Sequence, residues 1–150
     1  MYDYFVAPLR CPNCNTVSPA TAITDMQTYI RGDADGSELP VGCSLDPMDL
    51  TVRHLVGADY KLIAPPLANG SLRLLDVWIC PSCKTEQWAM IEVVQNQIER
   101  IEAVVLNRAT LEAANFVSET DAELLAKALA APADPHQRLD TIDILRQRLE

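Results

Sequence analysis

The stretch RCPNCNT at residues 10–16 is matched by ICPSCKT at residues 79–85. Both copies carry the frame Cys-Pro-x-Cys, so four of the five cysteines form two spaced pairs: Cys11 with Cys14, and Cys80 with Cys83. Two residues between paired cysteines let the chain turn so that both sulfur atoms face one point. The two pairs therefore predict that distant parts of the chain meet at one metal site, and this meeting constrains the whole fold.

The chemistry of four thiolates indicates the type of metal site. A tetrahedral Cys₄ set is accepted by Zn²⁺, with Zn–S bonds of about 2.3 Å, and it leaves no position for water or substrate. We therefore predict one structural zinc ion per chain, and iron stays open because it accepts the same ligands. The predicted ligands are Cys11, Cys14, Cys80 and Cys83.

The residues around the cysteines fit a tight turn after each first ligand. Pro12 and Pro81 fix φ at the turn position that follows the first cysteine. The residue after the second cysteine often needs a positive φ, which Asn15 tolerates well and Lys84 tolerates less well.

These two knuckles resemble those of zinc-ribbon and rubredoxin-like proteins, over residues 10–16 and 79–85 only. The resemblance implies a metal ion held between two hairpin tips. The segment from residue 15 to residue 79 is far longer than the connection in compact ribbons. We therefore expect a β-rich, zinc-ribbon-like body with a long insert between the knuckles.

The composition limits the classes of partner. The chain has 12 Lys and Arg against 21 Asp and Glu, a formal charge of −9, which repels nucleic-acid backbones and anionic lipids. No apolar run approaches the roughly 18 to 20 residues that span a bilayer, and the opening MYDYFVAPL lacks a basic signal region. We expect a cytoplasmic protein, where paired thiols more often bind metals or do redox chemistry than form structural disulfides.

Short alternating runs predict strands over most of residues 1–107. In residues 71–80, Leu72, Leu74, Asp76 and Trp78 alternate with Arg73, Leu75, Val77 and Ile79. Residues 33–42 carry an Asp-Gly pair between extended stretches, which predicts a hairpin. Residues 86–107 fit either an amphipathic helix or two strands broken at residues 95–97. We favour the strands, because no N-cap precedes the segment and a metal knuckle usually sits at a hairpin tip.

From Ala109 onward the pattern turns helical. Residues 109–117 place Leu111 and Ala114 on one side, with Phe116 or Val117, and Ser118 with Asp121 resembles a capping box for the next helix. Prolines break the pattern within residues 131–137, and a last amphipathic helix carries the stripe Leu139, Ile142, Leu145 and Leu149. We expect these helices to fold back on the sheet, with association through them as the alternative.

This order predicts an α+β fold in two parts. We expect a β-rich zinc-binding domain over residues 1–107 and two or three C-terminal helices over residues 108–150.

Two other functions compete with a structural metal site. A Cys-Pro-x-Cys thiol–disulfide oxidoreductase needs its first cysteine at a helix N-terminus, whereas each pair here joins strand-like sequence. A nucleic-acid-binding ribbon would use exposed aromatics beside basic residues. Trp78 and Trp88 flank the second knuckle, with Lys84 between them and Arg10 and Arg73 as candidate neighbours, but the acidity favours tryptophans packed over the metal site.

The remaining reactive residues have ordinary structural interpretations. Cys43 is expected to be a small buried hydrophobe, with a redox or fifth-ligand role as the alternative. His54 is expected on the surface or satisfied in a strand, and His136 in a loop, so a Cys-His enzyme has little support. Residues 31–38, RGDADGSE, read as a solvated hairpin tip, because a calcium loop aligned on Gly36 would place Arg31 and Gly42 at ligand positions.

These observations favour a non-enzymatic, structural-zinc module that mediates protein–protein interaction. An acidic surface suits a basic partner, so an inhibitor or immunity-type factor is the most specific form of this hypothesis. The thiol–disulfide oxidoreductase and the nucleic-acid-binding zinc ribbon remain the alternatives.

Overall fold

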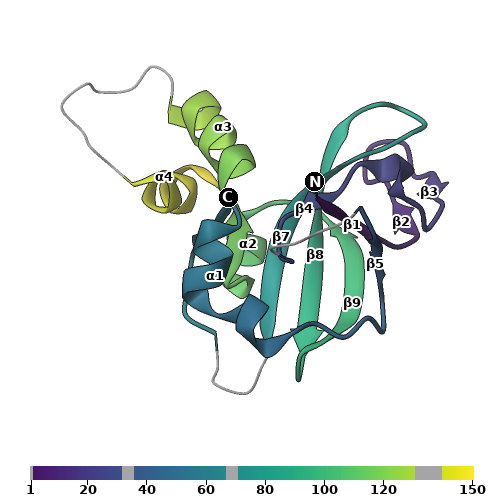
Figure 1. The fold of residues 1–150 in the computed structure, drawn as a ribbon. Coiled ribbons are helices and arrows are strands. Elements are labelled where there is room, and N and C mark those ends of the chain that lie inside the picture. Colours follow the sequence, from purple (N-terminus) through teal and green to yellow (C-terminus); the bar gives the residue numbers. More distant parts are fainter. Residues whose placement is uncertain (1, 32–35, 67–70, 131–139) are drawn as a thin grey trace.

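The computed structural model describes residues 2–31, 36–66, 71–130 and 140–150. In these residues the chain forms an α+β fold in layers, with a small sheet and a helical layer on opposite sides of a larger sheet (Figure 1). The strands are β1 (Asp3–Val6), β2 (Leu9–Arg10), β3 (Val17–Ser18), β4 (Gln27–Thr28), β5 (Glu38–Pro40), β6 (Tyr60–Leu62), β7 (Leu72–Ile79), β8 (Glu86–Val94), β9 (Gln97–Val104) and β10 (Phe116–Ser118). The helices are α1 (Val52–Gly57), α2 (Arg108–Ala113), α3 (Glu119–Ala130) and α4 (Thr141–Arg148), with short 3₁₀ turns at η1 (Ala22–Thr24) and η2 (Pro47–Leu50).

The larger sheet has the strand order β6-β10-β7-β8-β9. Strands β7, β8 and β9 form an antiparallel meander, and β7 pairs with β8 from Leu72 opposite Val93 to Ile79 opposite Glu86. The alternation predicted for β7 is confirmed. Leu74 and Trp78 enter the core on one face of the sheet, and Leu75 enters the core on the other.

Residues 86–107 form two strands, as predicted. β8 and β9 are joined by a tight turn in which Gln95 has φ 50° and Asn96 has φ 66°. Positive φ at both central residues is the geometry that suits the twist of a two-residue hairpin. Ile91 and Ile101, which also fit a helical stripe, lie directly opposite each other across the two strands.

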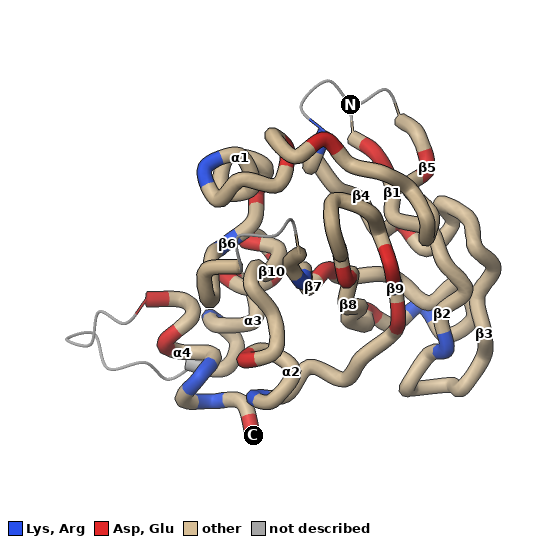
Figure 2. Tube along the Cα trace, turned by 90° about the horizontal axis from the view of Figure 1, so that it is seen from below, with Lys and Arg blue, Asp and Glu red and all other residues tan. Residues whose placement is uncertain are grey.

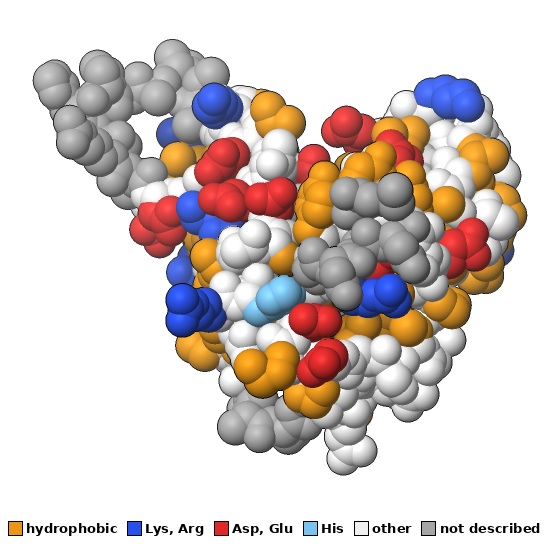
Figure 3. All heavy atoms as spheres, in the orientation of Figure 1, with side chains coloured by type: hydrophobic (Ala, Val, Ile, Leu, Met, Phe, Trp, Pro, Cys, Tyr) orange, Lys and Arg blue, Asp and Glu red, His pale blue; other side chains and the backbone are white. Residues whose placement is uncertain are grey.

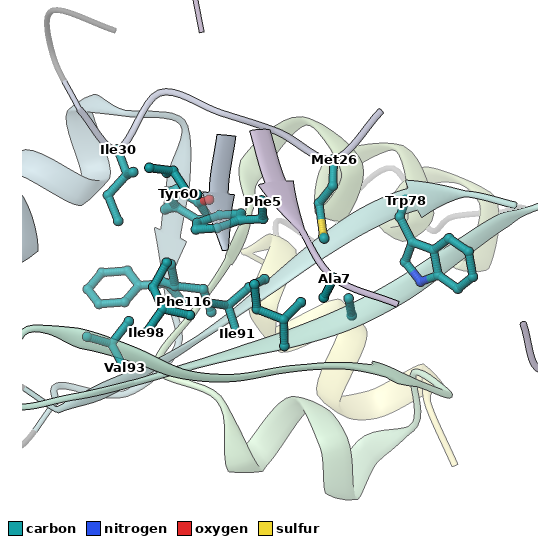
Figure 4. Packing of buried hydrophobic residues seen from close by; sticks show 14 of the residues in the cluster. Phe5, Ala7, Met26, Ile30, Tyr60, Trp78, Ile91, Val93, Ile98 and Phe116 are labelled. Carbon is teal, nitrogen blue, oxygen red and sulfur yellow. The ribbon is translucent and has the colours of Figure 1, made fainter. Parts of the chain in front are cut away.

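The first core lies between the larger sheet and the small sheet, whose strand order is β4-β1-β5. Phe5, Met26 and Ile30 are fully buried and lie over Ile91, Ile98 and Phe116 of the larger sheet (Figure 4). Trp78 lies at one end of the labelled residues in Figure 4, and the buried cysteines Cys11 and Cys80 belong to the same cluster.

The second core lies between the other face of the larger sheet and the C-terminal helices. Ala122 and Ala126 of α3 and Ile142 and Leu145 of α4 pack with Leu75 of β7. The predicted fold-back of the last helix is therefore confirmed for Ile142 and Leu145. Leu139 and the proline break at residues 131–137 lie outside the described residues. None of the helices that the structure describes is long and apolar enough to cross a membrane.

The predicted hairpin at residues 33–42 is wrong in its pairing, although most of its turn lies outside the described residues. β4 and β5 do not pair with each other, because β1 lies between them, antiparallel to β4 and parallel to β5. Asp3 at the start of β1 gives a physical reason. Its buried carboxylate accepts a hydrogen bond from the Ser37 backbone at 2.9 Å and lies 3.0 Å from Arg31 Nε, so both ends of the intervening segment are attached to β1.

Two further elements differ from the sequence prediction. Phe116 and Val117, expected on a helix, form β10, and each faces a different core. Because β10 lies between β6 and β7, the part of the chain after residue 107 contributes a strand to the larger sheet. The division into domains at that residue stays a prediction.

The segment before β6 contains helical turns where only strands were expected. Asp46 caps η2 by accepting from the Met48 backbone, with Pro47 at the first position, and Thr51 caps α1 by accepting from the His54 backbone.

A polar chain of three side chains crosses the first core. The Tyr60 hydroxyl donates to Asp76 Oδ2 at 2.5 Å and lies 2.9 Å from Thr28 Oγ1. Asp76 is only 4% exposed, and burial raises the pKa of its carboxyl group well above the ordinary value. Burial also raises the pKa of Tyr60, and the neighbouring Asp76 raises it further. The folded protein therefore favours the protonated form of Asp76.

We predict that the Asp76→Asn variant loses much of the pH dependence of stability. The folded-state pKa of Asp76 lies above the unfolded value of about 3.9. Between about pH 4 and the folded-state pKa, the unfolded chain therefore binds fewer protons than the folded chain does. The free energy of unfolding of the unmodified chain should fall across this window, by about 1.4 kcal/mol for each pKa unit of separation. Urea denaturation at stepped pH measures this slope.

Glu123→Gln on the exposed face of α3 removes the same charge and serves as the control. The same slope in both variants would contradict the assignment to Asp76.

Candidate metal centre

Two hairpin tips bring the four paired cysteines together. The first knuckle lies between β2 and β3, which pair antiparallel, and the second lies between β7 and β8. In Figure 1 both tips lie at the same end of the molecule. This arrangement agrees with the implication drawn from zinc ribbons, in which a metal ion sits between two hairpin tips.

The two knuckles have the same backbone geometry. In the first, Asn15 N–H donates to Cys11 O at 2.8 Å and Cys11 N–H donates to Thr16 O at 3.0 Å. In the second, Lys84 N–H donates to Cys80 O at 2.8 Å and Cys80 N–H donates to Thr85 O at 3.0 Å. Asn15 and Lys84 both have φ 62°. Lys84 therefore adopts the left-handed conformation despite its less favourable side chain, which costs on the order of 1 kcal/mol.

The four sulfur atoms have the spacing of a tetrahedral metal site. All four lie within 4.8 Å of one another, with Cys11 Sγ 3.7 Å from Cys83 Sγ and Cys14 Sγ 3.6 Å from Cys80 Sγ. Ligands at about 2.3 Å from one ion lie about 3.8 Å apart at the corners of a regular tetrahedron. All five cysteines are free thiols, and these separations are far longer than a disulfide bond of about 2.05 Å. The cluster is thus positioned to bind one metal ion, and its donor set suits Zn or Fe alike.

Hydrogen bonds around the two half-buried sulfur atoms, those of Cys14 and Cys83, favour the thiolate form that a metal ligand needs. The Asn13 backbone donates to Cys11 Sγ at 3.4 Å, and Asn13 Nδ2 donates to Cys83 Sγ at the same distance across the site. The Thr85 hydroxyl lies 3.0 Å from Cys83 Sγ. The Asn13 side chain, with the Thr85 hydroxyl and backbone, lowers the pKa of Cys83 to about 5. Thr16 lowers the pKa of Cys14 in the corresponding way.

Sequence reasoning missed the roles of Asn13, Thr16 and Thr85. A signal was present for the threonines, because both seven-residue windows end in Thr. For Asn13 the signal was weaker, since its counterpart in the second window is Ser82, which has a different side chain.

The metal site is continuous with the first core. Cys11 is 0% and Cys80 is 1% exposed, whereas Cys14 and Cys83 are half-buried. Trp78 is fully buried in the same cluster, and its indole N–H donates to Trp88 O at 3.0 Å. The expectation that both tryptophans pack over the metal site is wrong for Trp88, which packs against the second core. Trp78 belongs to the cluster that contains Cys11 and Cys80, and its ring is not exposed for stacking on a base.

The other candidate residues lie away from this cluster. Cys43 packs against the first core, and its thiol donates to Ser44 O at 3.6 Å. His54 lies on α1 and not in a strand, and its Nε2 donates to Ile30 O at 2.6 Å. His136 lies outside the described residues. Among the residues with described placement, Cys11, Cys14, Cys80 and Cys83 form the one group of Cys, His, Asp and Glu whose ligand atoms converge on an ion-sized point.

We predict that Asn13→Ala weakens metal binding by about 10-fold or more, because it removes the side-chain donor to Cys83 Sγ. Competition with a colorimetric zinc chelator measures the dissociation constant. Ser82→Ala alters the same position of the other knuckle and should leave the affinity unchanged. Equal effects of the two substitutions would show that the cross-site hydrogen bond is not what tunes the ligand.

Comparison of the chain with protein-family models, with curated proteins and with solved structures finds no match. The assignment of the site therefore rests on the positions of its four cysteines.

Proposed function

We propose that the chain is a structural-zinc module that binds another protein. The observation that supports this most is the convergence of four cysteine sulfur atoms within 4.8 Å. Four thiolate ligands complete the coordination of zinc, so the ion has no position for a water nucleophile or a substrate. We therefore assign the metal a structural role, in which it holds the two hairpin tips together. The binding function then belongs to the surface of the protein.

The charge of the surface suits a basic partner. The formal charge of the chain is −9, and acidic segments occur on most elements while basic segments are separated around the molecule (Figure 2). Complementary charge raises the rate of encounter and selects among partners. An inhibitor or immunity-type factor for a basic protein is the specific form of this proposal.

A thiol–disulfide oxidoreductase is the second candidate, because a lowered thiol pKa, here about 5 at Cys83, is also a property of reactive cysteines. Such enzymes place the attacking cysteine at a helix N-terminus. Here each pair lies at a hairpin tip, and the first cysteine of each pair is buried. The same hydrogen bonds also serve a metal thiolate, so the lowered pKa does not by itself favour redox chemistry over metal binding.

Metal analysis separates the two candidates. Protein purified without added metal should contain about one zinc per chain, and a strong chelator should unfold it, because zinc binding supplies on the order of 10–16 kcal/mol in small zinc peptides. The paired thiols should resist alkylation until the metal leaves. A metal-free chain that stays folded, with one cysteine of each pair alkylating quickly near neutral pH, would establish the redox candidate instead.

The partner proposal predicts an ionic-strength dependence. A basic protein recovered with this chain from its native host should bind several-fold more weakly when salt rises from about 0.05 M to about 0.5 M, because salt screens the exposed charges. Calorimetric titration of the purified pair measures the affinity. Salt-independent binding, or capture of acidic proteins only, would contradict electrostatic selection of the partner.

A further inference from the structure

A cavity of about 350 Å³ lies where the small sheet, the larger sheet and the start of α3 meet. Its walls come from the segment around β4, from the residues before β6, from the adjoining ends of β7 and β8, and from residues 118–121. Figure 3 shows acidic side chains on both sides of a hollow between the part that carries α3 and the part that carries β2 and β3. The volume is within the range of small-ligand sites, about 300–1,000 Å³.

The residues that line the cavity give it one sign of charge. Among the described residues, five with carboxyl groups line the cavity and no Lys, Arg or His does; the acids are Asp25, Asp59, Asp76, Glu86 and Asp121. The positive end of α3 does not reverse this sign. The first N–H of α3, at Glu119, donates to Asp59 O at 2.8 Å, and Asp121 lies in the first helical turn.

One of these acids is buried and faces the cavity with an unused oxygen. Asp76 is 4% exposed and lines the cavity. Its Oδ2 accepts the Tyr60 hydroxyl, while Oδ1 accepts no hydrogen bond from any residue that the structure describes. This oxygen is open to the cavity, so a donor supplied from outside the chain can reach it.

The negative charge of Asp121 acts on the two buried side chains that line the cavity, Asp76 and Tyr60. After the larger effects of burial, the charge of Asp121 raises the pKa of both Asp76 and Tyr60. A bound cation would offset this effect and favour the carboxylate form of Asp76 over the protonated form that the folded chain favours without a ligand, whereas a bound anion would raise the pKa further. Tyr29 also lines the cavity, and its ring, 44% exposed, is held edge-on by Tyr2 at a centroid distance of 5.6 Å. An aromatic ring at an acidic site is a further attraction for an organic cation.

The spacing of the acids argues against a single metal ion. Among the described residues, no group of carboxylates gathers its oxygen atoms on one ion-sized point, as the four cysteines do. Carboxyl groups spread around a cavity of this size instead match a ligand whose donors are separated by several bonds.

We propose that this cavity binds an organic cation of the ammonium or guanidinium class, with a nitrogen donor at Asp76 Oδ1 and further positive charge near Asp121. The ligand is either a free polyamine or a basic side chain of a protein. This site is separate from the cysteine cluster and does not depend on which metal the cluster holds.

Titration of the full-length, metal-replete chain tests the proposal. The probes are spermidine, for the free amine, and acetyl-Arg-Arg-amide, for the side chain of a protein. Backbone amide signals of Tyr29 and Thr120 should shift saturably with at least one probe. Tighter binding of spermidine identifies a free amine, and tighter binding of the peptide identifies a protein side chain. No saturable shift with either probe, or displacement of both by equimolar Mg²⁺, would overturn the proposal.

Matched variants separate the cavity from the general charge. Asp76→Asn and Asp121→Asn should each weaken binding of the tighter probe by about tenfold or more. Glu99→Gln on β9 removes the same charge from an exposed position outside the cavity lining and should have little effect. Should Asp76→Asn fail to fold, the half-buried Asp121 still provides the test. Equal weakening by Glu99→Gln and Asp121→Asn would show that the net charge of the chain explains the binding, and would overturn the proposed site. Zinc content and resistance to alkylation should be the same in all three variants, so a failure here leaves the metal proposal standing.

Discussion

The mutual position of four sulfur atoms is the constraint on which the rest of the structure depends. Thiolates within 4.8 Å repel one another unless a cation lies between them. In small zinc peptides the ion supplies about 10–16 kcal/mol, which is as large as the whole net stability of a typical domain. Strands of the small sheet and of the first knuckle are only two to four residues long. Such short strands add little stability by themselves, so the attachment of one hairpin tip to the other helps to hold them over the first core.

The metal site and the first core form one continuous unit. Cys11 and Cys80 are buried in the same cluster as Phe5 and Trp78, and the half-buried Cys14 and Cys83 pack against it. Burial in this cluster keeps water from Cys11 and Cys80, while Asn13 and Thr85 supply polar contacts to the half-buried Cys83. Burial and metal coordination would also make these thiols poor nucleophiles in the metal-bound protein.

The sequence predicted the features that are encoded by local pattern. Period-two alternation located β7, the knuckles located the β7–β8 and β2–β3 tips, and the polar break at residues 95–97 located the β8–β9 turn. The pairing of β5 with β1 depends on the buried carboxylate of Asp3, a contact between residues distant in sequence, and no periodicity reveals it. Phe116 and Val117 were misassigned because three residues between two helices are too few to show a period of two. At the metal centre the four cysteines were readable from spacing, whereas Asn13 acts across the site and is visible only in three dimensions.

The insertion of β10 between β6 and β7 has a consequence for synthesis on the ribosome. Strands β6 and β7 leave the ribosome long before residues 116–118, yet in the finished sheet they are held apart by those residues. During translation the facing edges of β6 and β7 are therefore unpaired, and unpaired edges favour wrong partners. The larger sheet can therefore be completed only after β10 has been synthesised, and until then the edges of β6 and β7 that pair with β10 stay open to other strands.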